Sequence, residues 1–368
     1  MAKVLIFTGA GASAPLGLPT TEQFSKEIFE NSKKITDITQ RYLGEESGND
    51  IERLLSTLED FGNSSGLTGF IIENLENFIF THTNQNFHSS NTNLIRLLTQ
   101  KITDEQTDTA SEIKRIKGIV YRKLQKFDKE KAFELYKNII NELKREIPDC
   151  RISYSTANYD LTLDSALDSD SGFDEQTGII DAHYGFLPKK GKLSYDANTE
   201  YDWPADHIEY LKVHGSLDWH PDAMRGLCVK SGSSVNPQNP DDMVILYPGF
   251  KGIPSKEPFI SLHSKLEERL KSSDIVIVIG FAFRDPYINS LFETSIKQNP
   301  NKKYILINPT PANRFPSDSI IDRLINHKNF IHIEERLEIN EAPLNIRDIL
   351  NTHAPKLIES QSSNIAAK

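Results

Sequence analysis

Residues 4–14 read VLIFTGAGASA, and this stretch decides the fold. Its run of apolar residues is typical of a strand that is buried on both faces of a parallel sheet. The glycine pattern that follows at residues 9–14 matches G-x-G-x-x-A, in which the glycines allow a tight turn and a close approach to phosphate groups. The start of a following helix would add N–H groups for an anion. The alternative is an ordinary turn between a strand and a helix.

Strands and helices alternate along the rest of the chain. Helices are expected at about 20–30 and 286–297, and the polar region 167–204 is expected to form loops with at most a hairpin. This alternation predicts an α/β fold, a Rossmann-like doubly wound parallel sheet. Further strand-like runs lie at 151–155, 211–213, 227–229, 243–247, 275–279, 304–307 and 330–334.

A large all-helical insertion is expected after the first strand and helix. Apolar residues recur at helical spacing over residues 50–147. The predicted domains are a Rossmann core at 1–30 and 150–335, a helical insertion at 31–149, and a C-terminal helix or tail at 336–368. The insertion carries several large aromatic residues, and apolar stripes that the core cannot cover usually mark interfaces, so a homo-oligomer is expected.

Composition narrows the functional class. The chain has 368 residues, with 42 Lys and Arg against 52 Asp and Glu, so its formal charge is −10 and general nucleic-acid binding is not expected. The two cysteines, Cys150 and Cys228, cannot close a four-cysteine zinc site, and no metal is expected. No apolar run reaches the length of a membrane span, and no signal peptide is evident, so the expected location is the cytoplasm.

Polar residues follow several predicted strands. The segments are ANYD at 157–160, HG at 214–215, GFAFRDP at 280–286 and Asn308. Because the carboxyl ends of parallel strands meet at one edge of a sheet, these segments and the glycine turn are expected to form one site. Each segment also has a simpler explanation. Asn158, Asp160 and Asp285 could cap helices, and His214 could be an ordinary loop histidine.

In this order, the segments resemble the sirtuin superfamily, and within it the sirtuin-like domains of bacterial antiphage defence systems. The resemblance covers about 1–25 and 150–335. GAGAS with Leu18-Pro19-Thr20 resembles the opening GAGxS…G-[IL]-P, and residues 156–160 resemble the T-x-N-Y-D form of the TQN-x-D segment. The HG pair resembles the catalytic HG of the family. Residues 280–286 resemble GFSFxDP, and Asn308 is similar to the asparagine that holds the adenine-side ribose.

The resemblance implies that NAD⁺ is the substrate and assigns the residues. Asn158 would orient the ribose or the attacking water, His214 would act as the general base, and Asp160 would assist them in catalysis. Ser13 would contact the phosphate. The full set implied to bind NAD⁺ is Gly9, Ala10, Gly11, Ser13, Pro19, Thr20, Gly280, Phe281, Phe283, Asp285 and Asn308.

Two departures from the family separate the candidate activities. The four zinc cysteines of protein-deacylating sirtuins are not present, and PTTE at 19–22 replaces PDFR. Both favour an NAD⁺ glycohydrolase that makes ADP-ribose and nicotinamide. The resemblance further implies an abortive-infection effector, gated by a phage trigger or by a partner such as a HerA-type ATPase. The alternatives are an NAD-dependent protein deacylase, an ADP-ribosyltransferase, and a non-catalytic sensor of NAD or ADP-ribose.

Overall fold

A computed structural model of the chain divides into two compact units. The first comprises Met1–Thr20, Arg122–Leu246 and Phe250–Lys368, and the second comprises Thr21–Tyr121 and Tyr247–Gly249. The structure describes residues 2–31, 52, 55, 100, 110–168, 180–183, 186–189, 192–196, 207–222, 227–230, 243–247, 254, 256–299, 302–311, 320–325 and 330–337.

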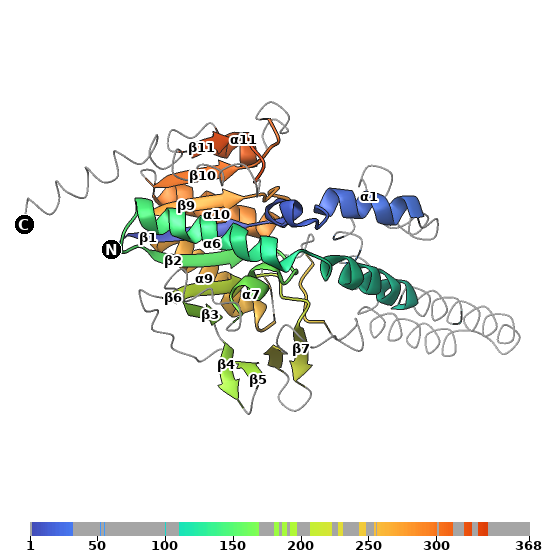
Figure 1. The fold of residues 1–368 in the computed structure, drawn as a ribbon. Coiled ribbons are helices and arrows are strands. Elements are labelled where there is room, and N and C mark those ends of the chain that lie inside the picture. Colours follow the sequence, from blue (N-terminus) through green and yellow to red (C-terminus); the bar gives the residue numbers. More distant parts are fainter. Residues whose placement is uncertain are drawn as a thin grey trace, which may run out of the picture. The chain divides into compact units, whose positions relative to one another are not determined.

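A seven-stranded parallel sheet forms the centre of the first unit (Figure 1). Its strand order is β11-β10-β9-β1-β2-β6-β3, so the order along the chain reverses at β1. The two strands beside β1 pair with it in register, Phe7 opposite Ser155 of β2 and Val278 of β9. The strands are β1 (Lys3–Thr8), β2 (Arg151–Thr156), β3 (Ile180–His183), β6 (His207–Lys212), β9 (Ile275–Ile279), β10 (Lys303–Ile307) and β11 (Phe330–Ile333).

Helices cover both faces of this sheet, which confirms the predicted doubly wound α/β class. Alternate residues of β1 enter different cores: Val4 and Ile6 pack with α6 (Lys129–Glu146) and α7 (Thr162–Ala166). Leu5 and Phe7 pack with three other helices on the opposite face. These helices are α9 (Phe259–Ser272), α10 (Pro286–Gln298) and α11 (Ile320–Ile325).

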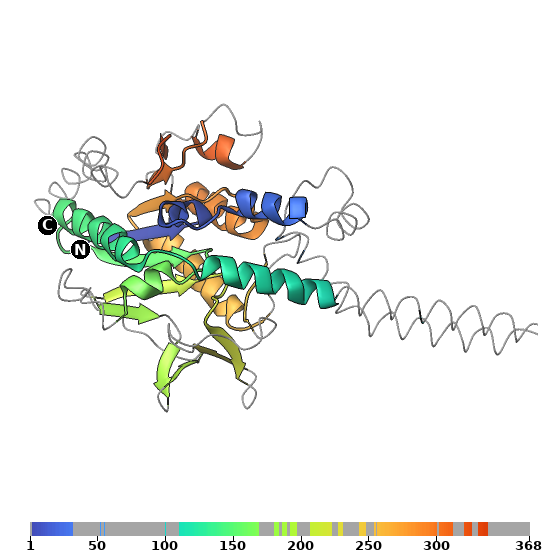
Figure 2. The same ribbon diagram turned by 45° about the vertical axis from the view of Figure 1, so that its right-hand side comes forward.

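A four-stranded antiparallel sheet lies beyond the β3 edge of the main sheet (Figure 2). Its strands are β4 (Phe186–Lys189), β5 (Lys192–Tyr195), β7 (Trp219–Asp222) and β8 (Leu227–Lys230), in the order β4-β5-β8-β7. The hairpin β4–β5 is the one that the polar region was expected to allow. β3 was not expected, because its four residues, IDAH, do not form an apolar run in the sequence.

Two local expectations were wrong. Two short 3-10 helices, η1 (Ala10–Ala12) and η2 (Ala14–Leu16), occupy the glycine pattern and the residues just after it, and α1 (Thr21–Asn31) begins only afterwards. No α-helix therefore starts directly after the glycine pattern. The segment 243–247 makes a single bridge, between Ile245 and Gly215, instead of a strand.

The second unit contains α1 and most of a helical segment at 110–124. Its buried residues include Phe24, Ile28 and Ile116. The helix α6, which the sequence placed in the insertion, belongs to the first unit and packs on the sheet. Most of 32–109 and all of 338–368 lie outside the described residues, so the insertion and tail boundaries stay predictions. No helix in the described part of the chain is long and apolar enough to span a membrane.

Candidate active site

Five polar segments meet at one edge of the main sheet, as the sequence predicted. β1, β2, β6, β9 and β10 are mutually parallel, so the segments that follow them leave the same edge. The segments start at Gly9, Ala157, Val213, Gly280 and Asn308. Because the strand order reverses at β1, this edge lies where α/β proteins bind ligands.

The glycines of the first turn pack against the backbone of the turn after β9. A Cβ atom on Gly280 would lie 2.3 Å from Ala12 N and 2.6 Å from Gly11 Cα, and a Cβ on Gly9 would lie 2.7 Å from Phe281 Cα. Gly280 also has φ 61°, which favours glycine. Any larger residue at these positions would clash with the backbone of the facing turn. This contact explains the glycines by itself, so the glycine pattern is not evidence for a bound phosphate.

Most N–H groups of the glycine turn donate hydrogen bonds to backbone carbonyls of the protein itself. Gly9 N donates to Ile279 O at 3.0 Å and Gly11 N to Gly280 O at 2.9 Å. The N–H groups of Ala12 and Ser13 donate to carbonyls of the turn itself. In the described part of the chain, the Ala10 N–H has no such acceptor. An anion at this turn would therefore meet the Ala10 N–H as a donor with no backbone acceptor among the described residues.

Asn158 is fixed in one orientation. Its backbone N–H donates to Thr156 Oγ1 at 3.0 Å, and its side-chain Nδ2 donates to Gly9 O at 3.0 Å and to Ser13 Oγ at 3.1 Å. Because Gly9 O can only accept, the nitrogen of the carboxamide must face the turn. The Oδ1 atom has no partner among the described residues, and the residue is only half-buried. Asn158 therefore offers one oriented acceptor to a ligand.

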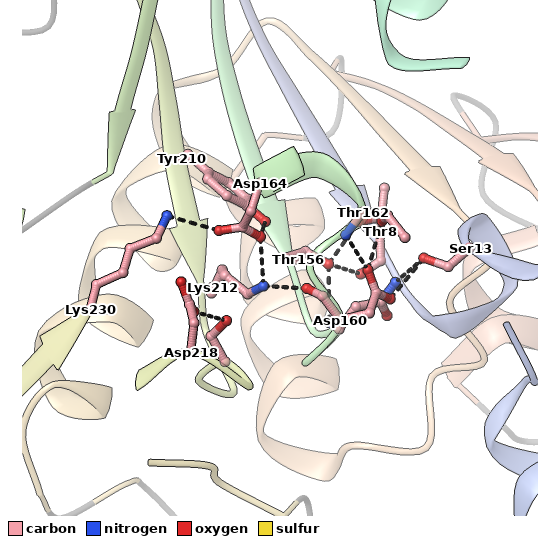
Figure 3. Close-up of polar contacts among 12 residues, drawn as sticks. Thr8, Ser13, Thr156, Asp160, Thr162, Asp164, Tyr210, Lys212, Asp218 and Lys230 are labelled. Atoms are coloured by element: carbon pink, nitrogen blue, oxygen red, sulfur yellow. Dashed lines mark hydrogen bonds and ion pairs between the residues drawn. The ribbon is translucent and has the colours of Figure 1, made fainter. Parts of the chain in front are cut away.

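Asp160 ties the turns together instead of facing a ligand (Figure 3). Its Oδ2 accepts from Ser13 Oγ at 2.8 Å, and its Oδ1 accepts from Thr162 N at 3.0 Å and Thr162 Oγ1 at 2.6 Å. Ser13 is 1% exposed and Asp160 6% exposed. Asp160 precedes the N-cap residue Leu161 and accepts from the first N–H of α7, and it also fixes the Ser13 hydroxyl.

His214 and Asp285 form a buried pair. His214 Nε2 lies 2.9 Å from Asp285 Oδ2, with the residues 2% and 6% exposed. Burial acts to raise the pKa of Asp285, but its contacts with His214 and with Ile288 N outweigh this and leave the pKa below its ordinary value. The ionised carboxylate can only accept, so Nε2 carries a proton, and in the neutral imidazole Nδ1 has the lone pair. Asp285 also caps α10 through Tyr287 N and Ile288 N.

The turn that presents His214 requires a glycine at position 215. Gly215 has φ 86°, and a Cβ there would lie 2.1 Å from Val244 O, so only glycine fits. The segment 243–246 closes over the turn, because Leu246 N donates to His214 O at 2.9 Å. This backbone hydrogen bond fixes the turn that carries the His214 imidazole at the sheet edge.

A second histidine, His263 of α9, lies next to His214. The ring centroids of the two histidines are 5.9 Å apart. The ring of Tyr159 lies 6.4 Å from that of His214, and the ring of Tyr287 lies 5.4 Å from that of His263. His263 Nδ1 contacts Phe259 O at 2.8 Å, and its buried Nε2 has no hydrogen-bond partner in the described structure. Burial first, and then the neighbouring His214, lowers the pKa of His263 to about 4.

The other residues implied to bind NAD⁺ have varied positions. Phe281 and Phe283 point into the core, where their rings lie 4.9 Å apart. Asn308 is 6% exposed and donates from Nδ2 to Phe281 O at 3.2 Å, so it joins the β10 and β9 ends. Pro19 and Thr20 are half-buried in the turns after η2.

The sequence reading missed a buried charge network beside Asp160, drawn in Figure 3. Lys212 Nζ donates to Asp160 O and lies 2.9 Å from Asp164 Oδ2, while Lys230 Nζ lies 2.9 Å from Asp164 Oδ1. Tyr210 OH also donates to Asp164 Oδ2, at 3.0 Å. The available signal was Lys212 itself, a charged residue within a strand that the fold must bury, where a partner is required.

The described residues include no group of three or more metal-ligand side chains. Cys150 and Cys228 are both buried free thiols. Burial raises the pKa of Cys150 to about 11 and also raises the pKa of Cys228, which keeps both thiols protonated.

A family model described as a SIR2-like domain matches residues 152–333. The match runs from β2 to β11, so it includes Asn158, His214 and Asp285 but not the Gly9 turn. Similarity to Sir2 homologues extends over most of the chain. A triple mutant in complex with 2′-O-acetyl-ADP-ribose is 14% identical with a TM-score of 0.45, over 96% of this chain and 93% of that one.

A Sir2 homolog–NAD complex is 13% identical with a TM-score of 0.41, over 91% of this chain and 85% of that one. A Sir2 homologue with a serine-to-alanine mutation, bound to ADP-ribose, is 15% identical with a TM-score of 0.39, over 97% and 94%. These TM-scores are too low to assign an activity to this chain. No curated protein matches it.

Proposed function

We propose that this chain, which carries a SIR2-like domain over residues 152–333, is an NAD⁺ glycohydrolase that releases nicotinamide and ADP-ribose. The observation that carries the proposal is the buried His214–Asp285 pair, 2.9 Å apart, at the sheet edge that also presents Asn158. A histidine with a fixed tautomer and an amide with a fixed orientation are what a hydrolase needs to direct one water molecule.

The chemistry assigns a separate task to each side chain. The bond from C1′ of the ribose to nicotinamide breaks as nicotinamide leaves with the bonding electrons as a neutral base, and the ribose gains positive charge. Water then attacks C1′, and its proton passes to His214 Nδ1. Asn158 Oδ1 accepts a hydrogen bond from that water or from a ribose hydroxyl. Asp285 holds the imidazole and stabilises its charged form.

The residues fit NAD⁺ as a substrate at the ribose end more fully than at the pyrophosphate. Asn158 Oδ1 has no partner in the described structure, and His214 Nδ1 carries a lone pair. At the glycine turn, the Ala10 N–H is the donor left for a phosphate oxygen. Ser13, buried and bonded to Asp160, supports Asn158 and is no longer assigned to the phosphate.

The biological role extends the proposal beyond the site. We propose an antiphage effector of abortive infection that acts in the cytoplasm as a homo-oligomer and depletes NAD⁺ when triggered. Activation would come from a phage product or a protein partner such as a HerA-type ATPase. The antiphage role rests on the resemblance to defence-system domains. A trigger is required because an unregulated NAD⁺ hydrolase would kill its host.

The decisive experiment incubates the purified full chain with NAD⁺, alone and with the product of the neighbouring gene, and measures nicotinamide and ADP-ribose. His214→Ala and Asn158→Ala should each lower turnover by about 10²–10⁴-fold while the protein stays folded at the assay temperature. Acyl transfer from an acetylated peptide without free ADP-ribose would identify a deacylase. NAD⁺ binding with no nicotinamide release under either condition would identify a sensor and refute the hydrolase.

A further inference from the structure

A fully buried lysine lies behind the Asn158 turn. Lys212 is 1% exposed, and its ammonium contacts two acceptors, the backbone oxygen of Asp160 and the carboxylate of Asp164. Burying an ammonium is costly unless charge and hydrogen bonds compensate it, and an apolar residue of similar size would often serve a core as well. The lysine therefore needs an explanation other than packing.

The contacts of Lys212 supply that explanation. Asp160 O is the carbonyl two residues after Asn158, and it belongs to the turn that carries both Asn158 and the Ser13-binding carboxylate. The backbone oxygen of this turn is held by Lys212, the last residue of β6, and His214 lies two residues later in the turn that follows this strand. The Lys212 side chain thus adds a link between the 157–160 turn and the end of β6, and Figure 3 shows its contact with Asp160.

We propose that Lys212 is a positioning residue for the reaction, which holds the 157–160 turn at a fixed distance from the end of β6 and so from His214. Lys230 of the small sheet completes this clamp, which consists of Lys212, Asp164 and Lys230, by its ion pair with Asp164. The proposal rests on the proposed function for its catalytic part. Lys230 lies on β8, so the clamp also anchors the antiparallel sheet to the site.

The chain offers a matched control on the same strand. Glu209 of β6 and Arg269 of α9 form another buried ion pair, with Arg269 Nη2 2.7 Å from Glu209 Oε1 and Ser153 Oγ 2.9 Å from Glu209 Oε2. This pair lies on the opposite face of β6 and earlier along the strand, away from the carboxyl end. Its loss should cost stability without moving the Asn158 turn.

The experiment compares Lys212→Met, Lys230→Met and Arg269→Met in the full chain. Lys212→Met leaves Asp164 paired with Lys230, so the variant does not strand that carboxylate. Hydrogen–deuterium exchange of the amides of Asn158 and Thr162, which donate to Thr156 Oγ1 and Asp160 Oδ1, reports the turn directly and requires no activity.

We expect both amides to exchange about 10-fold faster in Lys212→Met but not in Arg269→Met. Each variant is measured at a temperature the same number of degrees below its own melting temperature. With NAD⁺, the kcat of Lys212→Met should fall about 10²-fold and its KM should change little, because a misplaced group costs rate more than binding. Lys230→Met should lower kcat less, since it does not touch Asp160.

Two outcomes would overturn the proposal. One is unchanged exchange of these amides in Lys212→Met, or an equal increase in Arg269→Met, which would make Lys212 an ordinary stabilising residue. The other is faster exchange with an unchanged kcat. A wild type that never cleaves NAD⁺ refutes the proposed function, and the exchange data still decide whether Lys212 holds the turn.

Discussion

His263 should make the folded protein sensitive to acid, and the effect can be calculated. Its pKa falls from 6.5 to about 4 in the folded chain, because burial and the neighbouring His214 disfavour its charged form. Between these pH values the unfolded chain binds a proton that the folded chain does not, so stability falls as the pH falls through this window. The shift corresponds to about 3 kcal/mol of unfolding free energy between pH 7 and pH 4.

The perturbation is His263→Phe. Phenylalanine keeps a flat ring beside His214 and Tyr287, and it removes the unpartnered Nε2, which takes up the proton, along with the Nδ1 bond to Phe259 O. Urea unfolding curves at pH 7, 6, 5 and 4 give the free energy of unfolding of both proteins. Near-UV circular dichroism at pH 7 checks that the variant is folded.

The variant should lose stability less steeply than the wild type on acidification. The difference between the two proteins should change by about 3 kcal/mol from pH 7 to pH 4, in favour of the variant at low pH. Other groups titrate in this range, but they are common to both proteins and largely cancel. Parallel curves, within about 1 kcal/mol over the whole range, would show that His263 titrates normally and refute the reasoning.

Further expectations concern the site and the assembly. Asp285→Asn keeps a good N-cap for α10 but loses the charge that orients His214, so turnover should drop about 10²-fold in a protein that stays folded, as nicotinamide release would measure. Gly280→Ala should cost about 3 kcal/mol in denaturant unfolding, because its Cβ meets the Gly11 backbone, whereas Gly17→Ala, with nothing within 4 Å, should cost about 1 kcal/mol; equal costs would contradict this. EDTA should change neither the melting temperature nor turnover, and a loss reversed by zinc would reveal a metal site. Light scattering at micromolar concentration should detect an oligomer, and a strict monomer would remove that expectation.

The apolar strands made the fold class predictable. Residues 4–7 and 275–279 can be buried on both faces only in a parallel sheet with helices on each side, and this is the sheet observed. β3 escaped because IDAH has little apolar content, and its strand state depends on pairing with β6, which no local pattern encodes. The bridge at Ile245 likewise depends on a distant partner, Gly215.

The Asp285 cap of α10 was predictable from residue type, because Asp followed by Pro is a common helix start. His214-Gly215 was singled out by the family resemblance, and the catalytic role of His214 stays a prediction. Ser13 was assigned to a phosphate because its partner, Asp160, is 147 residues away in sequence and its burial is not visible locally. His263 lies in an apolar stripe of α9, and only tertiary packing brings it to His214.

The contact between Gly11 and Gly280 restricts how this site can diverge. It consists of backbone atoms alone, so substitution can break it but cannot adjust it. A library that aims to change ligand preference would therefore lose most of its folded members by varying the glycines. Exposed Ala282 and Arg284, which alternate with the buried phenylalanines of the β9 turn, can change without entering the core. New specificity at this edge has to be selected in such positions, while the glycine contact stays invariant.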